Sequence, residues 1–188
     1  MKSRRAQLLE FAVLGLLHEG PTHGYDLRRR LNTALGPFRA LSYGTLYPAL
    51  RDLLDHGLIA ETTDPAGPSG RRPRVVYELT AAGKEHFAEL VARTDASAYE
   101  DDGFDVRFAF FARTERDVRL RILEGRRSRV EEDLERVREA AARSRERLDA
   151  YTTALQRHGE ETTEREVRWL SELIDAERRH PTDPGPQP

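Results

Sequence analysis

Apolar residues recur at helical spacing along most of the chain, and the clearest case is the stretch 42–59. Leucines at positions 46, 50, 53 and 54 share one face of a helix whose residues advance by about 100° each. Ser42 is expected to cap its start, because a hydroxyl can accept a hydrogen bond from a free backbone N–H. Gly57 is expected to end it, because glycine adopts the left-handed conformation without a Cβ clash.

The opposite face of this helix is small and hydroxylated near its start, and its acidic residues come later. It contains Gly44, Thr45, Pro48, Asp52 and Asp55, with Arg51 at its margin, Tyr47 on the boundary and Tyr43 leaning inward. A helix that enters a DNA major groove by its N-terminal end has this arrangement, because its small groups reach base edges and its acids stay away from phosphate. An ordinary amphipathic surface helix has the same pattern, so both interpretations remain open at this point.

Two further helices are predicted ahead of this one. Residues 4–19 carry an apolar stripe so wide that the helix should be buried on more than one side. Gly20 and Pro21 should break it, and Thr22 is expected to cap a second helix that runs to about residue 35. Leu27 and Leu31 should form the inward face of the second helix, and Tyr25 is a further candidate for that face. A helix, a short break and a helix make the helix-turn-helix arrangement.

The pattern changes to a period of two after Gly57, which predicts strands at 59–63 and 75–80. The segment between them is rich in Gly and Pro over 64–70 and then carries the basic residues Arg71, Arg72 and Arg74. A two-stranded hairpin with a basic flank, placed after a candidate recognition helix, is typical of the wing of a winged helix. Its arginines would reach phosphates or the minor groove, although a solvated loop remains the alternative.

Behind the hairpin, Thr80 is expected to cap a helix over 81–93, and the acidic segment 95–103 reads as a linker. The segment 104–112 contains four phenylalanines whose spacing fits either a strand or a helix. We favour a helix, because no partner strand is evident nearby. Its apolar residues are expected to form core, and an apolar pocket for a small effector is the alternative.

A long helix is predicted from Thr114 to Arg157, ending at His158 and Gly159. Residues Val130, Leu134, Val137, Ala141, Ser144, Leu148, Tyr151 and Leu155 follow in steps of four and three, which is a heptad seam that needs a partner helix. A last helix, capped by Thr162 or Thr163, is expected to fold back against the first one. Dimerisation is assigned to Val130, Leu134, Val137, Leu148, Tyr151, Leu155, Leu170 and Ile174. The Pro-rich residues 180–188 are expected to be disordered.

Charge and composition narrow the function. Residues 1–94 carry 13 Lys or Arg against 10 Asp or Glu, whereas residues 95–188 carry 18 against 23. A basic front half and an acidic rear half suit a protein that touches nucleic acid at one end only. The chain has no cysteine, its histidines are scattered, and it has no phosphate-binding loop, so we expect neither an enzyme nor a metal or cofactor site. Neither a signal peptide nor a transmembrane span is indicated, and we expect a cytoplasmic protein.

Three motifs in order point to a known family. Pro-Thr-His-Gly-Tyr-Asp-Leu (21–27), Ser-Tyr-Gly-Thr-Leu-Tyr-Pro-Ala-Leu (42–50) and Arg-Arg-Pro-Arg-Val-Val-Tyr-Glu-Leu-Thr-Ala-Ala-Gly (71–83) resemble the PadR family of bacterial transcriptional regulators. The resemblance covers roughly residues 6–92, and residues 104–178 are similar in pattern to the C-terminal helical domain of its longer subfamily. It implies a homodimeric winged-helix repressor that binds a two-fold symmetric operator. Family members often release DNA on binding phenolic or drug-like molecules, but no motif here identifies such an effector.

The expected architecture is mostly α with a small β-wing. It comprises a winged helix-turn-helix DNA-binding domain (1–94), an antiparallel long-helix hairpin for dimerisation (104–179) and a tail (180–188). The residues expected to contact double-stranded DNA are Ser42, Tyr43, Gly44, Thr45, Tyr47, Pro48, Arg51, Arg71, Arg72 and Arg74. The resemblance places Tyr43, Gly44, Thr45 and Pro48 on the groove side of the recognition helix. The alternative is a winged-helix module with a coiled-coil arm that binds protein and not DNA.

Overall fold

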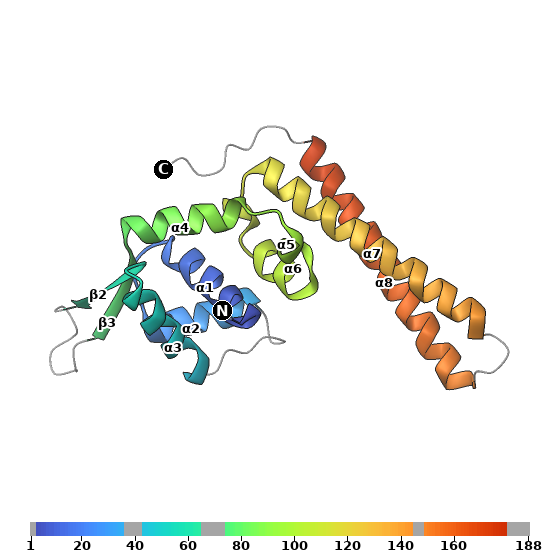
Figure 1. The fold of residues 1–188 in the computed structure, drawn as a ribbon, viewed down its shortest axis with the longest axis horizontal. Helices are drawn as coiled ribbons and strands as arrows, with labels where there is room; N and C mark the ends of the chain where they lie inside the picture. The colour runs from blue at the N-terminus through green and yellow to red at the C-terminus, as the bar shows by residue number, and fades with distance from the viewer. Residues whose placement is uncertain (1–2, 36–42, 65–73, 145–148, 180–188) are drawn as a thin grey trace. The chain divides into compact units, whose positions relative to one another are not determined.

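The computed structural model of the chain describes residues 3–35, 43–64, 74–144 and 149–179. The described elements follow one another as α1 (Arg4–Leu17), β1 (Thr22–His23), α2 (Gly24–Leu35), α3 (Tyr43–Asp55), β2 (Ile59–Asp64), β3 (Arg74–Leu79), α4 (Ala81–Ala92), α5 (Ala96–Tyr99), α6 (Asp101–Phe108), the 3₁₀ turn η2 (Phe111–Arg113), α7 (Arg116–Ser144) and α8 (Ala150–Arg179) (Figure 1). The chain divides into two compact units. The first comprises Met1–Arg93 with Asp105–Ala112, and the second Thr94–Phe104 with Arg113–Pro188.

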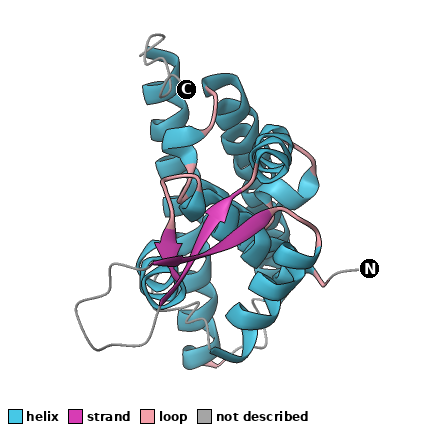
Figure 2. Ribbon diagram, turned by 90° about the vertical axis from the view of Figure 1, so that its left-hand side faces the viewer, coloured by secondary structure: helices cyan, strands magenta, loops and turns pink. Residues whose placement is uncertain are grey.

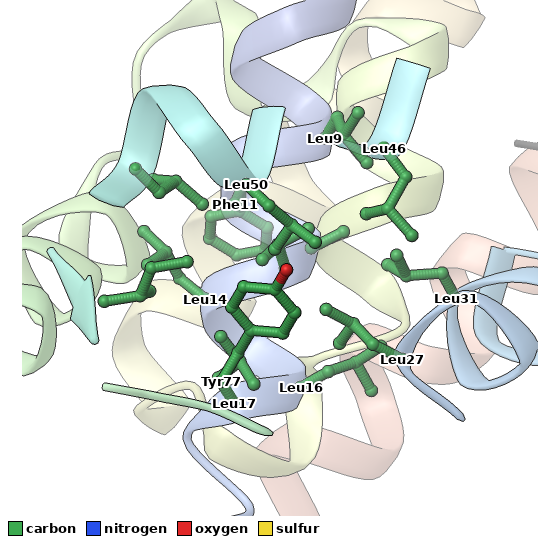
Figure 3. Packing of buried hydrophobic residues seen from close by; sticks show 14 of the residues in the cluster. Leu9, Phe11, Leu14, Leu16, Leu17, Leu27, Leu31, Leu46, Leu50 and Tyr77 are labelled. Carbon is green, nitrogen blue, oxygen red and sulfur yellow. The ribbon is translucent and has the colours of Figure 1, made fainter. Parts of the chain in front are cut away.

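Helix α1 is the centre of the first unit. Every residue from Phe11 to Leu17 is buried, which confirms the prediction that this helix is covered on more than one side. The Phe11 ring lies 5.4 Å from the ring of Phe87 on α4 and 5.5 Å from that of Phe110. Figure 3 shows the surrounding leucines of α1, α2 and α3 together with Tyr77 of β3 in one cluster.

Helix α3 buries the predicted face and ends where the sequence indicates. Leu46, Leu50 and Leu53 are each 1 % exposed or less. Gly57 has a φ of +67°, and the Gly57 N–H donates to the Leu54 carbonyl at 2.9 Å. The Leu58 N–H donates to the Leu53 carbonyl, also at 2.9 Å, which completes a Schellman motif. The predicted C-terminal glycine is therefore confirmed, whereas Ser42, the expected N-cap, lies outside the described residues.

The sheet has three antiparallel strands in the order β1-β3-β2, and Figure 2 shows them side by side. Strands β2 and β3 form the predicted hairpin, in a register that runs from Ile59 opposite Leu79 to Asp64 opposite Arg74. The expectation that Thr22 caps the second helix is wrong. Thr22 lies in β1 opposite Tyr77, and its hydroxyl donates to the Gly20 carbonyl at 3.1 Å. The pairing with a strand more than fifty residues away leaves no local signal in the sequence.

Helix α4 closes the first unit behind the hairpin. The Thr80 hydroxyl accepts a hydrogen bond from the Gly83 N–H at 3.0 Å, so the predicted cap is confirmed. The same hydroxyl lies 2.7 Å from the Gly57 carbonyl, to which it can donate. The cap therefore ties the start of α4 to the end of α3, the element on which the candidate site is built.

The sequence predicted a linker over residues 95–103. This prediction is wrong, because the segment forms α5 and the start of α6. Asp95 caps α5 by accepting from the Ser97 N–H at 3.0 Å. The helix favoured for 104–112 is present only as far as Phe108. Its apolar residues are core: Val106 and Phe110 join the cluster of the first unit, and Phe104 is buried in the second unit against Trp169.

Helices α7 and α8 form the antiparallel hairpin of the second unit, but the chain reverses earlier than predicted. Residues 158 and 159 lie inside α8, so they do not end a helix. Thr162 and Thr163 are not caps either, because their hydroxyls donate to the carbonyls four residues before them. The cap of α8 is Asp149, whose carboxylate accepts from the backbone N–H of Tyr151 at 2.9 Å. The heptad pattern continues from α7 into α8, and for this reason the sequence pattern did not indicate where the chain reverses.

Ion pairs join the two long helices along their length. Arg119 contacts Glu177 at 2.8 Å, Arg126 contacts Glu166 at 2.8 Å, and Arg138 contacts Glu164 at 2.6 Å. The predicted seam is divided by this arrangement. Its residues Val130 and Leu134 are buried within the chain, as are Leu170 and Ile174 of the residues assigned to dimerisation; Val137 is half-buried, and Tyr151 and Leu155 are exposed on α8. Leu148 lies outside the described residues. Among the helices that the structure describes, none is long and apolar enough to span a membrane.

Candidate nucleic-acid interface

The outer face of α3 presents the side chains that the sequence assigned to it. Tyr47, Pro48 and Arg51 are exposed, and Thr45 is half-buried. The inward leucines hold these residues outward, because the two sets alternate on opposite sides of one helix. The backbones of Tyr43 and Gly44 form the first turn of α3. This turn contains no acidic residue.

The acidic residues of α3 lie in its last two turns. Asp55 is exposed, and the Asp52 carboxylate lies 3.5 Å from Nδ1 of His56. The same His56 nitrogen lies 2.6 Å from the Asp52 carbonyl oxygen. Negative charge is therefore kept away from the N-terminal end of the helix, as an approach to a polyanion requires.

A groove of about 420 Å³ separates the start of α3 from the start of α1. Thr45, Pro48 and Asp52 line one wall, and Ser3, Arg5 and Glu10 lie on the other. Arg5 is thus a basic residue near the predicted contact face that the sequence reasoning did not include. The cluster Lys2-Ser3-Arg4-Arg5 was the available signal, but its position at the start of the chain invited comparison with a signal peptide.

The hairpin supplies the second part of the predicted interface. Arg74 is the first residue of β3, and its backbone lies opposite that of Asp64 in the register with β2. Arg71 and Arg72 lie outside the described residues, so their assignment to the basic flank of the wing stays a prediction. In the described part of the hairpin, Val75 is 43 % exposed on β3.

A second groove, of about 650 Å³, lies between the start of α2, Tyr47 of α3 and strand β3. Tyr25 lines it and is 64 % exposed, so this tyrosine, a candidate for the inward face of the second helix, does not face inward. Tyr77 also lines the groove but is buried. Burial, followed by the charge of Glu61 and a hydrogen bond to it, raises the pKa of Tyr77, so its hydroxyl stays protonated at neutral pH.

The described residues contain no group of three histidines or carboxylates placed to hold a metal ion. His18, Glu19 and His23, considered as metal ligands on spacing alone, have other contacts. The ring of His18 packs on Phe87 at 5.5 Å, and Glu19 pairs with Arg30. Nδ1 of His23 lies 3.3 Å from the Val75 carbonyl oxygen.

Part of the chain matches a known protein family. Residues 13–89 match the sequence model described as "Transcriptional regulator PadR-like family". A curated relative, "Negative transcriptional regulator PadR" of Bacillus subtilis, is 32 % identical over 87 residues, which are 46 % of this chain and 47 % of the relative. The matched region thus spans about half the length of that relative. The motifs singled out in the sequence lie within or beside the matched residues.

Solved structures are similar to the chain as well. A crystal structure of Bacillus subtilis PadR in complex with operator DNA has a TM-score of 0.44 and 21 % identity, over 90 % of this chain and 98 % of that one. A PadR-like transcription factor from Bacteroides fragilis has a TM-score of 0.41 and 30 % identity, over 46 % and 79 %.

Proposed function

We propose a function from one premise: residues 13–89 belong to the PadR-like family of transcriptional regulators. The chain binds double-stranded DNA through the first turns of α3 and through the β2–β3 hairpin, and thereby regulates transcription. The observation that carries this proposal is the outward face of α3, where Thr45, Tyr47 and Pro48 precede the acidic residues Asp52 and Asp55 while the leucines behind them are buried. A groove-reading helix needs a rigid, acid-poor tip of this kind.

The test begins with the sites that the protein occupies on its own genome. A duplex from such a site and a scrambled duplex are then titrated with protein in fluorescence anisotropy, at several salt concentrations. We expect affinity to fall steeply with salt, because phosphate contacts release counterions. Binding to neither duplex would exclude the proposal and favour a protein-binding winged helix.

Base reading is tested by Thr45→Ala, with Thr153→Ala on α8 as a matched control. Thr45→Ala should weaken binding to the genomic site more than binding to the scrambled duplex, because only base contacts carry sequence information. Equal losses on both duplexes would remove Thr45 from base readout.

The wing is tested by replacing Arg72 with Ala. The substitution should reduce the slope of log affinity against log salt concentration by about one unit, and an unchanged slope would place Arg72 off the DNA.

The proposal includes a homodimer held by the outer face of α8. Tyr151 is 88 % exposed and Leu155, one turn later, is 70 % exposed. Trp169, eighteen residues after Tyr151 and so five full turns along the helix, lies on the same face and is 40 % exposed. Large apolar side chains exposed in this way are costly in water and are covered when two copies pair.

Light scattering tests the pairing. Wild-type protein should be a dimer at micromolar concentration, and Leu155→Glu should dissociate it, because the substitution places a charge in an apolar contact. Thr153→Glu, a charge at an exposed position off this face, should leave the dimer intact. A monomeric wild type, or a Leu155→Glu variant that stays dimeric, would contradict this part of the proposal.

The sense of regulation is also proposed. The name of the Bacillus subtilis relative describes a negative regulator, which supports a repressor. In a reporter strain, deletion of the gene should raise expression from the bound promoter, whereas a fall would indicate an activator.

Release of the DNA by a small apolar or aromatic effector is also proposed, and it rests on the family resemblance. Loss of anisotropy on adding such molecules to the protein–DNA complex would identify one.

A further inference from the structure

The groove between α2, α3 and β3 combines exposed aromatic side chains with polar tips. Tyr25 comes from the start of α2, Tyr47 from α3 and Val75 from β3, and all three are more than 40 % exposed. Tyr77 forms the buried base of the groove, and its hydroxyl is hydrogen-bonded to Glu61. Tyrosines with an apolar ring and an accessible hydroxyl are typical of contact surfaces, because the hydroxyl can donate to a partner while the ring covers apolar ground.

The walls of the groove are held at fixed positions. The His23 ring lies 3.3 Å from the Val75 carbonyl through Nδ1, which ties the start of α2 to β3. Gly24 allows β3 to come close, because a Cβ there would lie only 3.3 Å from the Tyr77 ring, whereas the Tyr47 hydroxyl oxygen of α3 would lie at an ordinary contact distance of 3.4 Å. The two exposed tyrosines are therefore presented by packed elements and not by a loop.

Helix α2, which begins at the groove, carries a net positive charge that favours an anionic partner. Asp26 also lines the groove, but its carboxylate lies 3.3 Å from the guanidinium of Arg29. Glu19, before β1, pairs with Arg30. Helix α2 contains three arginines, Arg28, Arg29 and Arg30, and a single acidic residue, Asp26. The start of α2 thus offers hydroxyl donors on a helix of net positive charge.

We propose that this groove receives the sugar–phosphate backbone of the DNA duplex, with the Tyr25 hydroxyl donating a hydrogen bond to a phosphate oxygen. The inference rests on the proposed function. The groove lies between α3 and β3, the two elements assigned to the DNA, so a strand that leaves the major groove at α3 for the hairpin passes over it. In helix-turn-helix proteins the helix ahead of the recognition helix commonly crosses the backbone. Tyr25 is a contact that no sequence signal assigned.

The contact has a distinctive signature in binding experiments. A hydroxyl–phosphate hydrogen bond reads no base, so its loss weakens binding to every sequence alike. The tyrosine carries no charge, so its removal displaces no counterion and leaves the salt slope unchanged. Thr45→Ala should change specificity and an arginine substitution should change the slope, whereas a Tyr25 substitution should change neither.

The experiment compares the full-length wild type with Tyr25→Phe, and uses Thr33→Ala as a control that removes an exposed hydroxyl near the far end of α2. We expect Tyr25→Phe to lose about tenfold in affinity for both the genomic and the scrambled duplex, at an unchanged salt slope. Thr33→Ala should bind as the wild type does. Thermal unfolding should be the same for Tyr25→Phe and wild type, because the hydroxyl is exposed.

Two results would overturn the assignment. If Tyr25→Phe binds both duplexes as tightly as the wild type, the hydroxyl does not touch DNA, and a small aromatic molecule becomes the better occupant of the groove. If the loss is confined to the genomic duplex, Tyr25 reads bases and not phosphate. In both cases the wild type still binds DNA with a steep salt dependence, so the proposed function survives. A wild type that binds no DNA would instead refute the proposed function itself.

Discussion

Gly83, in the first turn of α4, offers a sharp test of the packing between this helix and the start of β2. The position is buried, and a Cβ built there would lie 1.9 Å from the Leu58 carbonyl oxygen and 2.9 Å from its carbon. The obstacle is backbone, so no side chain can turn aside. The Leu58 carbonyl also accepts from the Thr80 N–H at 3.2 Å, which means that a shift disturbs the start of the helix as well.

The expected size of the effect follows from two opposing terms. Real Cβ atoms essentially never approach another atom closer than 3.0 Å, so α4 and Leu58 would have to separate by more than 1 Å. Overpacking of this kind costs about 1–3 kcal/mol, and the upper end applies because backbone has to move. Alanine is favoured over glycine in a helix by about 1 kcal/mol. Gly83→Ala should therefore lower the free energy of unfolding of the first unit by about 2 kcal/mol.

Thermal unfolding followed by far-ultraviolet circular dichroism measures this change. A loss of 2 kcal/mol should lower the midpoint of a unit of this size by roughly 10 °C. The matched control is Gly159→Ala in α8, where nothing lies within 4 Å of the new Cβ. The control should gain up to about 1 kcal/mol from helix propensity alone. A Gly83→Ala variant as stable as wild type would refute the close approach of α4 to Leu58.

Two predictions concern the second unit. Arg126→Met should destabilise it by about 1–3 kcal/mol in urea unfolding, because half-buried Glu166 loses a partner at 2.8 Å, whereas Arg168→Met at an exposed position should have little effect. Hydrogen bonds from the side chain and backbone N–H of Thr152 lower the pKa of Asp149. Its contribution to α8 is present above the unfolded pKa of about 3.9 and is lost as pH falls through the lower folded pKa, so Asp149→Asn should flatten the acid dependence of helicity.

Some signals that act within a few residues were read correctly from the sequence. The inward face of α3 follows from the spacing of Leu46 and Leu50, because helical periodicity leaves apolar residues one side to occupy. Gly57 and Thr80 were placed correctly as the C-terminal glycine and the N-cap, since each satisfies backbone groups within its own turn. The outward face of α3 was predictable for the same reason, as the reverse side of its buried face.

Contacts between distant segments were the ones that sequence reasoning missed. Strand β1 exists only because Thr22 meets Tyr77, a residue more than fifty positions further along the chain. The reversal before α8 was hidden because the apolar spacing runs on from Val130 to Leu155 as if in one helix. Asp149 was the local signal for a new helix start, but nothing in the pattern gave it more weight than His158.

The amino-acid sequence alone determined which faces of α1 and α3 are apolar, where α3 ends and which family the front half resembles. These features depend on side-chain period and backbone capping, which are local properties of the chain. Only the tertiary structure decided that Arg5 lies across a groove from Thr45, that Tyr25 and Tyr47 share a groove, and that Leu170 is buried while Tyr151 is not. Such facts depend on which distant segments exclude water from each other, and residue spacing carries no information about that choice.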